Sequence, residues 1–355
     1  MNNKQSIIFL SSLLLLNSTG TLANSLLGPD LLGYSAIAGA AMTIEANAVV
    51  SDNLGANAAA SIGAGTDTAD IYAGAAVAIG DSSNIANIYA GDAAGIAANA
   101  TAGNIYSGAA VVVGAGGGAA DIYSGAAVSL GAGASAGDVY AVGAITGVGA
   151  NSTTASFDTS DSINAYKETL NIANALEQIE TAQATLLELE SDFALPTTLG
   201  AYAFEPGVYG GSALTITAGA TITLDGNGEE NPFWVFNLSG ALSAGAGSIF
   251  EITNAGGGAS VIWNIGGAAT LGAQASFIGT VFSYGAITGG AGSVISCGNL
   301  FSLGAIGIGS LTSTNCIGTD SWDGSVNGLN DGLNITDGVA SNGITVPLKT
   351  CPKSW

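Results

Sequence analysis

Residues 70–80 read DIYAGAAVAIG, and four further copies of this phrase follow at a fixed spacing. The copies read NIYAGDAAGIA, NIYSGAAVVVG, DIYSGAAVSLG and DVYAVGAITGV. The five phrases open every 17 residues, at Asp70, Asn87, Asn104, Asp121 and Asp138. A period this short, rich in Gly and β-branched residues, is typical of a β-solenoid rather than of helical repeats. The phrase therefore predicts an array of five stacked β coils over residues 70–150.

The same phrase returns later in the chain with looser spacing. Residues 280–288 read TVFSYGAIT and residues 299–307 read NLFSLGAIG, while two earlier copies, VFNLSGALS and IWNIGGAAT, end at Ser243 and Thr270. We therefore expect both halves of the chain to be coils of one solenoid. The predicted divisions are a signal peptide, an N-terminal coil or cap region, the array, a helix, C-terminal coils and a C-terminal tail or cap, at residues 1–23, 24–69, 70–150, 158–193, 196–316 and 317–355.

Residues 158–193 differ in character from the predicted coils on either side. Apolar residues recur there at steps of three and four, as in an amphipathic α-helix: Ile163, Tyr166, Leu170, Ala173, Leu176, Ile179, Leu186 and Leu189. About 30 helical residues would extend roughly 45 Å, close to nine coils stacked at about 4.8 Å. The pattern therefore predicts a helix long enough to run along the solenoid and cover one side.

The first 23 residues have the pattern of a secretory signal peptide. Lys4 precedes an apolar run from Ile7 to Leu16, and the segment ends in the small-residue pattern of a cleavage site. Neither this run nor a later one supplies the roughly 20 uninterrupted apolar residues of a spanning helix. We predict a secreted protein that begins near Asn24 after cleavage and does not insert into a membrane.

Charge excludes several classes of function. The chain has four Lys, no Arg and no His against 26 acidic residues, for a net charge of −22. Binding to nucleic acid or to anionic membranes is therefore not expected. A G-x-S-x-G match at residues 133–137 has no histidine to serve as base, and Asp70, Asp121 and Asp138 are interpreted as turn residues. No catalytic residue, metal site or cofactor is predicted, and we expect a monomer.

Three cysteines, Cys297, Cys316 and Cys351, lie in the last sixth of the chain. An exported protein meets oxidising conditions, so one disulfide is expected and one thiol is left over. Cys297 and Cys316 are about one coil apart, whereas a bond from Cys316 to Cys351 would pin the tail. The spacing does not choose between these pairings.

Residues 196–315 resemble the microbial ice-binding (antifreeze) protein family. The resemblance is carried by Pro206-Gly207-Val208-Tyr209, by the turn at residues 223–226 and by the aromatic strand at residues 233–236. It implies an all-β solenoid fold, a discontinuous right-handed β-helix with one long flanking α-helix, and a non-enzymatic protein that adsorbs to ice and inhibits its growth and recrystallisation. The array at residues 70–150 departs from the family pattern and is interpreted as extra coils that lengthen the solenoid.

The face that would meet ice follows from strand alternation. In Gly285-Ala286-Ile287-Thr288, Ile287 is the natural core residue, so Ala286 and Thr288 should point outward. The same alignment predicts outward pairs in three other C-terminal coils and in the array: Ala241/Ser243, Ala268/Thr270, Ala305/Gly307, Ala76/Ala78, Ala93/Gly95, Ala110/Val112, Ala127/Ser129 and Ala144/Thr146. A charge-free column of small residues is unusual on a surface and would order water through methyl and hydroxyl groups.

Four alternatives stay open from the sequence. In the first alternative, the predicted helix covers this small-residue face, because close contact with a helix also selects small residues. In the second alternative, ice binds to another side of the solenoid, which carries Thr215, Thr217, Thr221 and Thr223. A ladder formed by Tyr72 and its four repeats would bind sugars by stacking, although cross-coil packing explains it equally well. The alternative function is a structural or adhesive extracellular β-solenoid.

Overall fold

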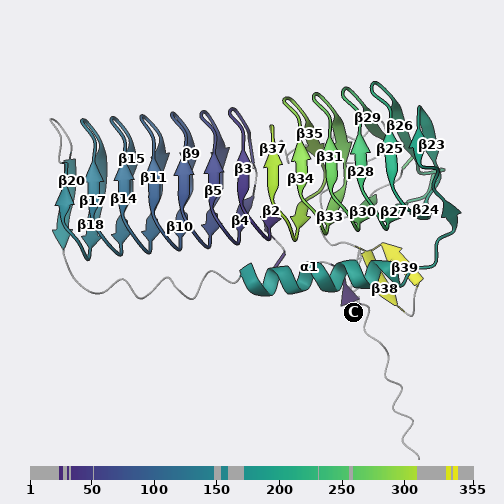
Figure 1. The fold of residues 1–355 in the computed structure, drawn as a ribbon, viewed down its shortest axis with the longest axis horizontal. Coiled ribbons are helices and arrows are strands. Elements are labelled where there is room, and N and C mark those ends of the chain that lie inside the picture. Colours follow the sequence, from purple (N-terminus) through teal and green to yellow (C-terminus); the bar gives the residue numbers. More distant parts are fainter. Residues whose placement is uncertain are drawn as a thin grey trace, which may run out of the picture.

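The computed structural model describes residues 24–26, 30, 31, 33–50, 52–147, 153–158, 172–230, 232–255, 259–309, 333–336 and 339–342. Parallel strands stack into one long solenoid, with a single α-helix alongside among the described residues (Figure 1). The predicted all-β solenoid with one flanking helix is confirmed. The predicted signal peptide lies outside the described residues.

One sheet of 13 parallel strands runs the whole length of the solenoid. Its strands, in spatial order, are β22 (Thr198–Leu199), β25 (Leu214–Ile216), β28 (Leu242–Ala244), β31 (Ala269–Leu271), β34 (Ile287–Gly289), β37 (Ile306–Ile308), β3 (Met42–Ile44), β5 (Ala60–Ile62), β8 (Val77–Ile79), β11 (Ala94–Ile96), β14 (Val111–Val113), β17 (Val128–Leu130) and β19 (Ile145–Thr146). Each coil contributes one of these short strands.

A second sheet, of 18 strands, forms the side that carries the helix. Its main row is β21 (Phe193–Ala194), β24 (Gly207–Gly211), β27 (Phe233–Leu238), β30 (Ser260–Ile265), β33 (Thr280–Ser283), β36 (Leu300–Ser302), β2 (Tyr34–Ala38), β4 (Asn53–Ala56), β7 (Ile71–Ala73), β10 (Ile88–Ala90), β13 (Ile105–Ser107), β16 (Ile122–Ser124), β18 (Ser135–Ala141) and β20 (Thr153–Asp158). Four short strands also belong to it through β18: β6 (Asp67–Thr68), β9 (Asn84–Ile85), β12 (Thr101–Ala102) and β15 (Gly118–Ala119).

Two smaller sheets complete the structure. The C-terminal coils close with β23 (Tyr202–Phe204), β26 (Thr221–Asp225), β29 (Ile249–Thr253), β32 (Ser276–Ile278) and β35 (Val294–Ser296). An antiparallel sheet pairs β1 (Asn24–Ser25) with β38 (Leu333–Thr336), which in turn pairs with β39 (Val339–Asn342). The predicted C-terminal tail therefore contributes a strand beside the expected start of the mature chain.

The two halves of the solenoid join through the beginning of the chain. Strand β2 pairs with β36 on one side and with β4 on the other, and β3 likewise lies between β37 and β5. The first coil is thus stacked on the last one, in the middle of the solenoid (Figure 1). Residues 24–69 were expected to be a coil or cap region. They form coils, but not a cap, because their strands lie between other coils and join the two halves of the solenoid.

The array has the expected 17-residue register, and it begins one coil earlier than the repeated phrase. Leu54 pairs with Ile71, and Ala60 pairs with Val77. Every coil turns through one residue with positive φ, at Gly65, Ser82, Asn99, Gly116 and Gly133. Gly, and to a lesser degree Asn, tolerate this left-handed conformation, which explains why four of these five residues are Gly or Asn.

The acidic and amide residues that open the repeats form a ladder between coils. The backbone N–H of Asn104 donates to Asn87 Oδ1 at 2.9 Å, and that of Asp138 donates to Asp121 Oδ1 at 2.9 Å. Asn87 Nδ2 also donates to Asp70 Oδ1 at 2.9 Å. For Asp121 the ladder confirms the interpretation as a turn residue that satisfies a backbone amide. Asp70 instead accepts hydrogen bonds from the side chains of Asn87 and Tyr72. Asp138 accepts one from the side chain of Tyr140.

The core changes in character along the solenoid. In the array it consists of Ile, Val, Leu and Ala side chains, since a 17-residue coil encloses a narrow interior. Two of the C-terminal coils beside the helix are longer, because 27 positions separate Gly210 from its partner Asn237 and Asn237 from Asn264. Their wider interior is filled by fully buried rings, including Trp234, Phe236 and Trp263, with Phe236 stacked on Trp263 at 3.9 Å. Longer coils therefore require aromatic side chains.

The helix, α1, spans Ile172–Leu187 and is shorter than predicted. Strand β20 ends at Asp158 and β21 begins at Phe193, so both limits of the predicted helix at 158–193 need correction. Residues 159–171, with Ile163, Tyr166 and Leu170, lie outside the described residues. Sixteen residues extend about 24 Å, so α1 covers only part of the solenoid.

The helix packs on the outer surface of the 18-stranded sheet in the C-terminal half. Its buried side chains, Ile172, Ala175, Ile179, Ala182 and Leu186, form one cluster with outward residues of that sheet: Ile37, Val208, Val235, Ile262, Phe282 and Phe301. Buried amides fix its position, because Asn237 Nδ2 donates to the Leu186 carbonyl at 2.7 Å and Asn264 Nδ2 to the Gln183 carbonyl at 3.2 Å. The helix is thereby assigned to this side (Figure 1).

In the array, a ladder of tyrosines occupies the outward position of the 18-stranded sheet. The residues at the same position in the C-terminal half are covered by the helix. Phe301 is in register with Ile37, Ile37 with Gly55, and Gly55 with Tyr72. The next four rings are stacked at centroid distances of 4.6 to 5.1 Å: Tyr89, Tyr106, Tyr123 and Tyr140. The cross-coil ladder predicted from the repeat is confirmed.

Cys297 is buried in the core and disulfide-bonded. Its two possible partners, Cys316 and Cys351, lie outside the described residues, so the pairing stays open. In the part of the chain that the structure describes, no helix has the length and apolar character needed to cross a membrane.

Candidate functional site: the small-residue face of the 13-stranded sheet

The outward residues at the centre of each strand form one column along the whole 13-stranded sheet. Backbone pairing places them side by side in the order Thr198, Thr215, Ser243, Thr270, Thr288, Gly307, Thr43, Ser61, Ala78, Gly95, Val112, Ser129 and Thr146. None of these residues is buried, while their strand neighbours, such as Leu242 and Ile287, are. We call this set the strand column.

A second column lies beside the first and consists of alanine. Each member precedes a strand, and for all of them except Ala213 the carbonyl is seen to accept a backbone N–H from the neighbouring coil, as that of Ala286 does from Ala269 at 3.0 Å. The members are Ala213, Ala241, Ala268, Ala286, Ala305, Ala41, Ala59, Ala76, Ala93, Ala110, Ala127 and Ala144, and all are at least partly exposed. We call this set the alanine column.

The structure brings together every residue that the sequence predicted for the face. Ala241, Ser243, Ala268, Thr270, Ala286, Thr288, Ala305 and Gly307 lie in the C-terminal half, and Ala127, Ser129, Ala144 and Thr146 lie in the array. The joint between β37 and β3 makes the two groups one surface. The face-to-ice assignment itself stays a prediction.

Several members of the face were missed by sequence reasoning. Thr43 and Ser61 belong to the first two coils and bridge the halves. Thr215 was grouped with an alternative side of the solenoid, but it pairs with Ser243 in the 13-stranded sheet, so that grouping was wrong. The signal was present: Ala213-Leu214-Thr215-Ile216 and Ala41-Met42-Thr43-Ile44 have the same form as Ala241-Leu242-Ser243-Ala244.

The helix does not cover this face. Its packing partners belong to the 18-stranded sheet, and the exposed side chains of Thr270 and Thr288 lie on the other sheet. The alternative in which the small residues make room for the helix was therefore wrong. Small size on this face must have another cause.

Charge is nearly excluded from the face. Both columns consist of Ala, Gly, Ser, Thr, Val and the backbone. Glu45 follows β3 at the edge of the sheet and is exposed, whereas the equivalent corner position is Gly63, Gly80 or Gly114 in later coils. A Cβ on those glycines would meet the backbone of the neighbouring coil. Nine of the 13 members of the strand column carry a hydroxyl, and the other four are Gly307, Ala78, Gly95 and Val112. Within this column Thr288 Oγ1 lies 3.3 Å from Thr270 Oγ1.

The sugar-binding alternative gains no support from the geometry of the tyrosine ladder. The tyrosine rings lie parallel within 9° of one another, so their faces contact neighbouring tyrosines rather than solvent. A sugar stacks on a ring face, which makes the middle of this ladder a poor sugar platform. Among the described residues, no cluster of three or more Cys, Asp or Glu has the arrangement of a metal site.

The chain matches one family and several proteins of that family. The Ice-binding-like family matches residues 122–314. An "Ice-binding protein" of Nostoc sp. (strain HG1) is 35% identical over 100 residues, and "Ice-binding protein 1" of Shewanella frigidimarina (strain NCIMB 400) is 28% identical over 109 residues. These matches cover 28% and 30% of this chain, and 36% and 12% of the two relatives.

Solved structures of ice-binding proteins also match this chain. The ice-binding protein from the Antarctic ascomycete Antarctomyces psychrotrophicus has 25% identity and a TM-score of 0.37, covering 62% of this chain and 92% of that one. An ice-binding protein from an Antarctic biological consortium has 18% identity and a TM-score of 0.44, covering 82% of this chain and 91% of that one.

Proposed function

Because the chain belongs to the Ice-binding-like family, we propose that it is an antifreeze protein that adsorbs to ice through the strand and alanine columns and performs no catalysis. The observation that carries this proposal is the uncharged face of the 13-stranded sheet, exposed over its full length. Surfaces are normally rich in charged residues, so a face without them requires a partner that disfavours charge.

The chemistry of the two columns suits an ordered water surface. Alanine methyl groups bind water weakly, and threonine and serine hydroxyls in the adjacent column hydrogen-bond to it. Coils stacked about 4.8 Å apart repeat the methyl groups at one fixed spacing. The hydroxyls recur at the same spacing in three runs, from Thr198 to Thr288, from Thr43 to Ser61 and from Ser129 to Thr146. Small side chains on a backbone fixed by inter-coil hydrogen bonds lose little entropy on adsorption, since they have few rotamers to order.

We also propose that adsorption takes place outside the cell. The signal-like pattern at residues 1–23 supports export, and the disulfide at Cys297 supports an oxidising compartment. A secreted protein that binds ice would limit growth and recrystallisation of ice around the cell.

The test replaces one face residue by a bulky one. Thr288→Tyr should abolish most ice shaping and thermal hysteresis, because the ring protrudes from the flat face that the two columns form. The melting temperature should stay close to wild type, since substitution of an exposed residue usually costs within about 0.5 kcal/mol. The measurements are photography of ice crystals grown in purified protein and a thermal melt of the same sample.

A matched control lies on another side of the solenoid. Thr221→Tyr places the same ring on β26, in the 5-stranded sheet, and should leave ice activity unchanged. Loss of activity in the Thr221 variant but not in the Thr288 variant would move the site to that side. Circular discs of unmodified ice in wild-type protein would remove the ice-binding proposal and favour the structural or adhesive alternative.

A further inference from the structure

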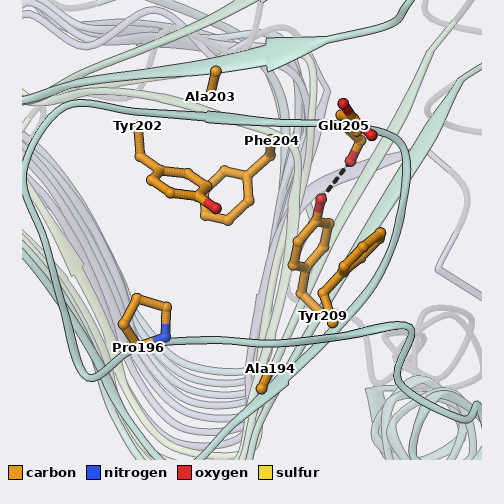
Figure 2. A pocket seen from close by; sticks show the side chains of 8 residues that line it. Ala194, Pro196, Tyr202, Ala203, Phe204, Glu205 and Tyr209 are labelled. Atoms are coloured by element: carbon orange, nitrogen blue, oxygen red, sulfur yellow. Dashed lines mark hydrogen bonds between the residues drawn. The ribbon is translucent and has the colours of Figure 1, made fainter.

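The C-terminal half ends in an open pocket of about 270 Å³. It lies in the interior of the outermost coil, at the end farthest from the array. Figure 2 shows Tyr202 and Phe204 on one side of the opening, Pro196 and Ala194 on the opposite side, and Tyr209 between the two sides. This volume is just below the usual range for ligand pockets, about 300–1,000 Å³, so it suits only a small ligand.

The pocket wall is aromatic and exposed. Phe193 and Tyr202 are 45% and 49% exposed, although the end of a solenoid normally has a polar outer surface. Phe204 forms the buried floor and contacts Tyr209 edge to face at 4.9 Å, while Tyr202 lies at 4.7 Å from Phe204. The terminal coil therefore presents a concave group of rings where a cap would otherwise be expected.

The rings are held in place before any ligand arrives. Tyr209 Oη donates to the Glu205 carbonyl at 2.7 Å, and Phe193 stacks on Tyr209 at 5.0 Å. The Val208 N–H donates to Asp192 Oδ2 at 2.9 Å and ties the segment before Phe193 to the Pro206-Gly207-Val208-Tyr209 turn. Gly207 has φ +150, and a Cβ there would lie 3.1 Å from the Phe193 ring, so glycine allows this packing.

The electrostatic field at the pocket is negative. Glu205 lines it, and none of its eight lining residues is Lys or Arg. Burial, together with the charges of Tyr202, Glu205 and Asp192, raises the pKa of Tyr209 to about 12, so its phenol is neutral and keeps its hydrogen bond at physiological pH. Phe193 and Phe236 stack on Tyr209 at 5.0 and 5.3 Å, so the exposed ring of Tyr202 is the one that offers a face to a ligand. An aromatic face and a nearby carboxylate both attract a cation, and rings favour a cation that carries apolar groups.

We propose that this end pocket, formed by Phe193, Tyr202, Phe204 and Tyr209 with Glu205 at its edge, binds a small methylated ammonium ion. The ion would contact the rings through its methyl groups and Glu205 through its charge. The site is at the end of the solenoid and shares no residue with the strand or alanine columns. Ion binding at this site can therefore be tested independently of ice adsorption.

The experiment titrates the full chain with tetramethylammonium chloride at constant ionic strength and detects binding by saturation-transfer NMR. We expect saturable binding of tetramethylammonium and at least fivefold weaker binding of tert-butanol, a neutral probe of similar shape. Tyr202→Ala and Glu205→Gln should each weaken tetramethylammonium binding severalfold. Both side chains are exposed, so a thermal melt should show a folded protein in each case.

The matched control is Tyr284→Ala, which removes an exposed tyrosine from another coil and should leave binding unchanged. Equal binding of tert-butanol, absence of saturable tetramethylammonium binding, or unchanged binding in both pocket variants would overturn the proposal. Co-sedimentation with phosphatidylcholine vesicles, if lost in Tyr202→Ala, would identify the ion as a lipid head group. Absence of co-sedimentation, with tetramethylammonium bound, would identify it as a free solute.

Discussion

Thr43, in the first coil, is paired backbone to backbone with Gly307, in the last one. This contact makes one continuous face out of two segments at opposite ends of the chain. Beside it, Gly39 is packed so closely on the neighbouring coil that a Cβ would collide with the carbonyl oxygen of Leu303.

The joint therefore predicts a position-specific effect of one methyl group. Gly39→Ala should destabilise the protein by about 1–3 kcal/mol, because the backbone at Leu303 must shift. The matched control is Gly307→Ala, since a Cβ there meets nothing within 4 Å. Guanidinium denaturation of both variants checks this, and equal stability of the two would contradict the tight joint.

The array should tolerate removal of one whole coil. Deleting residues 104–120 brings Ile122 next to Ile88 in the register that Ile105 now occupies, and Asp121 takes the place of Asn104 above Asn87. We expect a cooperative fold and retained ice activity, since the hydroxyl-bearing members of the strand column from Thr198 to Ser61 are untouched.

A deletion of residues 105–120, one residue shorter, is the control for that experiment. It shifts the register by one residue and directs core side chains outward, so its melting temperature should be much lower. A thermal melt followed by circular dichroism compares the two deletions. Similar melting temperatures would show that the array does not depend on its 17-residue register.

Within the tyrosine ladder, position should decide the cost of losing a ring. Tyr106 stacks on Tyr89 at 5.1 Å and on Tyr123 at 4.8 Å, whereas Tyr140 stacks on Tyr123 and has Asp158 in register on its other side. Aromatic pairs contribute about 0.5–1.5 kcal/mol each. Tyr106→Ala should thus cost about twice as much as Tyr140→Ala, and Tyr106→Phe should cost little. Urea denaturation gives the three values, and equal losses at Tyr106 and Tyr140 would argue against stacking.

Alkaline pH should destabilise the fold. Burial is the main cause that raises the pKa of both Tyr34 and Tyr209 from 10.0 to about 12, and nearby carboxylates add to it. The unfolded chain then releases these protons first, so stability is complete below pH 10 and falls as the pH rises from 10 towards 12.

Denaturation midpoints across that pH range, with tyrosinate absorbance recorded in parallel, test this prediction. Tyr209→Phe should reduce the slope, since one of the phenols with a raised pKa no longer titrates. A midpoint independent of pH above 10 would contradict the burial of these phenols.

The repeat was predictable because each coil must satisfy the same local demands. Asn104 and Asp121 have to accept an amide from the next coil, Ile105 has to fill the core, and Gly116 has to turn with positive φ. These demands recur in the sequence, so the fold, the tyrosine ladder and most of the face follow from it.

The joint, by contrast, has no periodic signal. Pairing of Ile37 with Phe301 depends on which coil comes last in the sequence. That is a property of the whole chain rather than of either segment. The end of the helix at Leu187 was also missed, because the apolar pattern continues to Leu189, which is buried beyond the helix. Tertiary packing rather than periodicity determined that boundary.

The joint also fixes an order of events during folding. Asn299 Nδ2 donates to the carbonyl of Tyr34, across 265 positions of sequence, so the first coil emerges long before the coil that pairs with it. Until residues 300–308 are made, the edge of β2 and β3 keeps a row of unpaired backbone groups. Closing this contact late makes folding slow, and at high concentration the open edge of one chain would accept the last coil of another, giving a domain-swapped dimer.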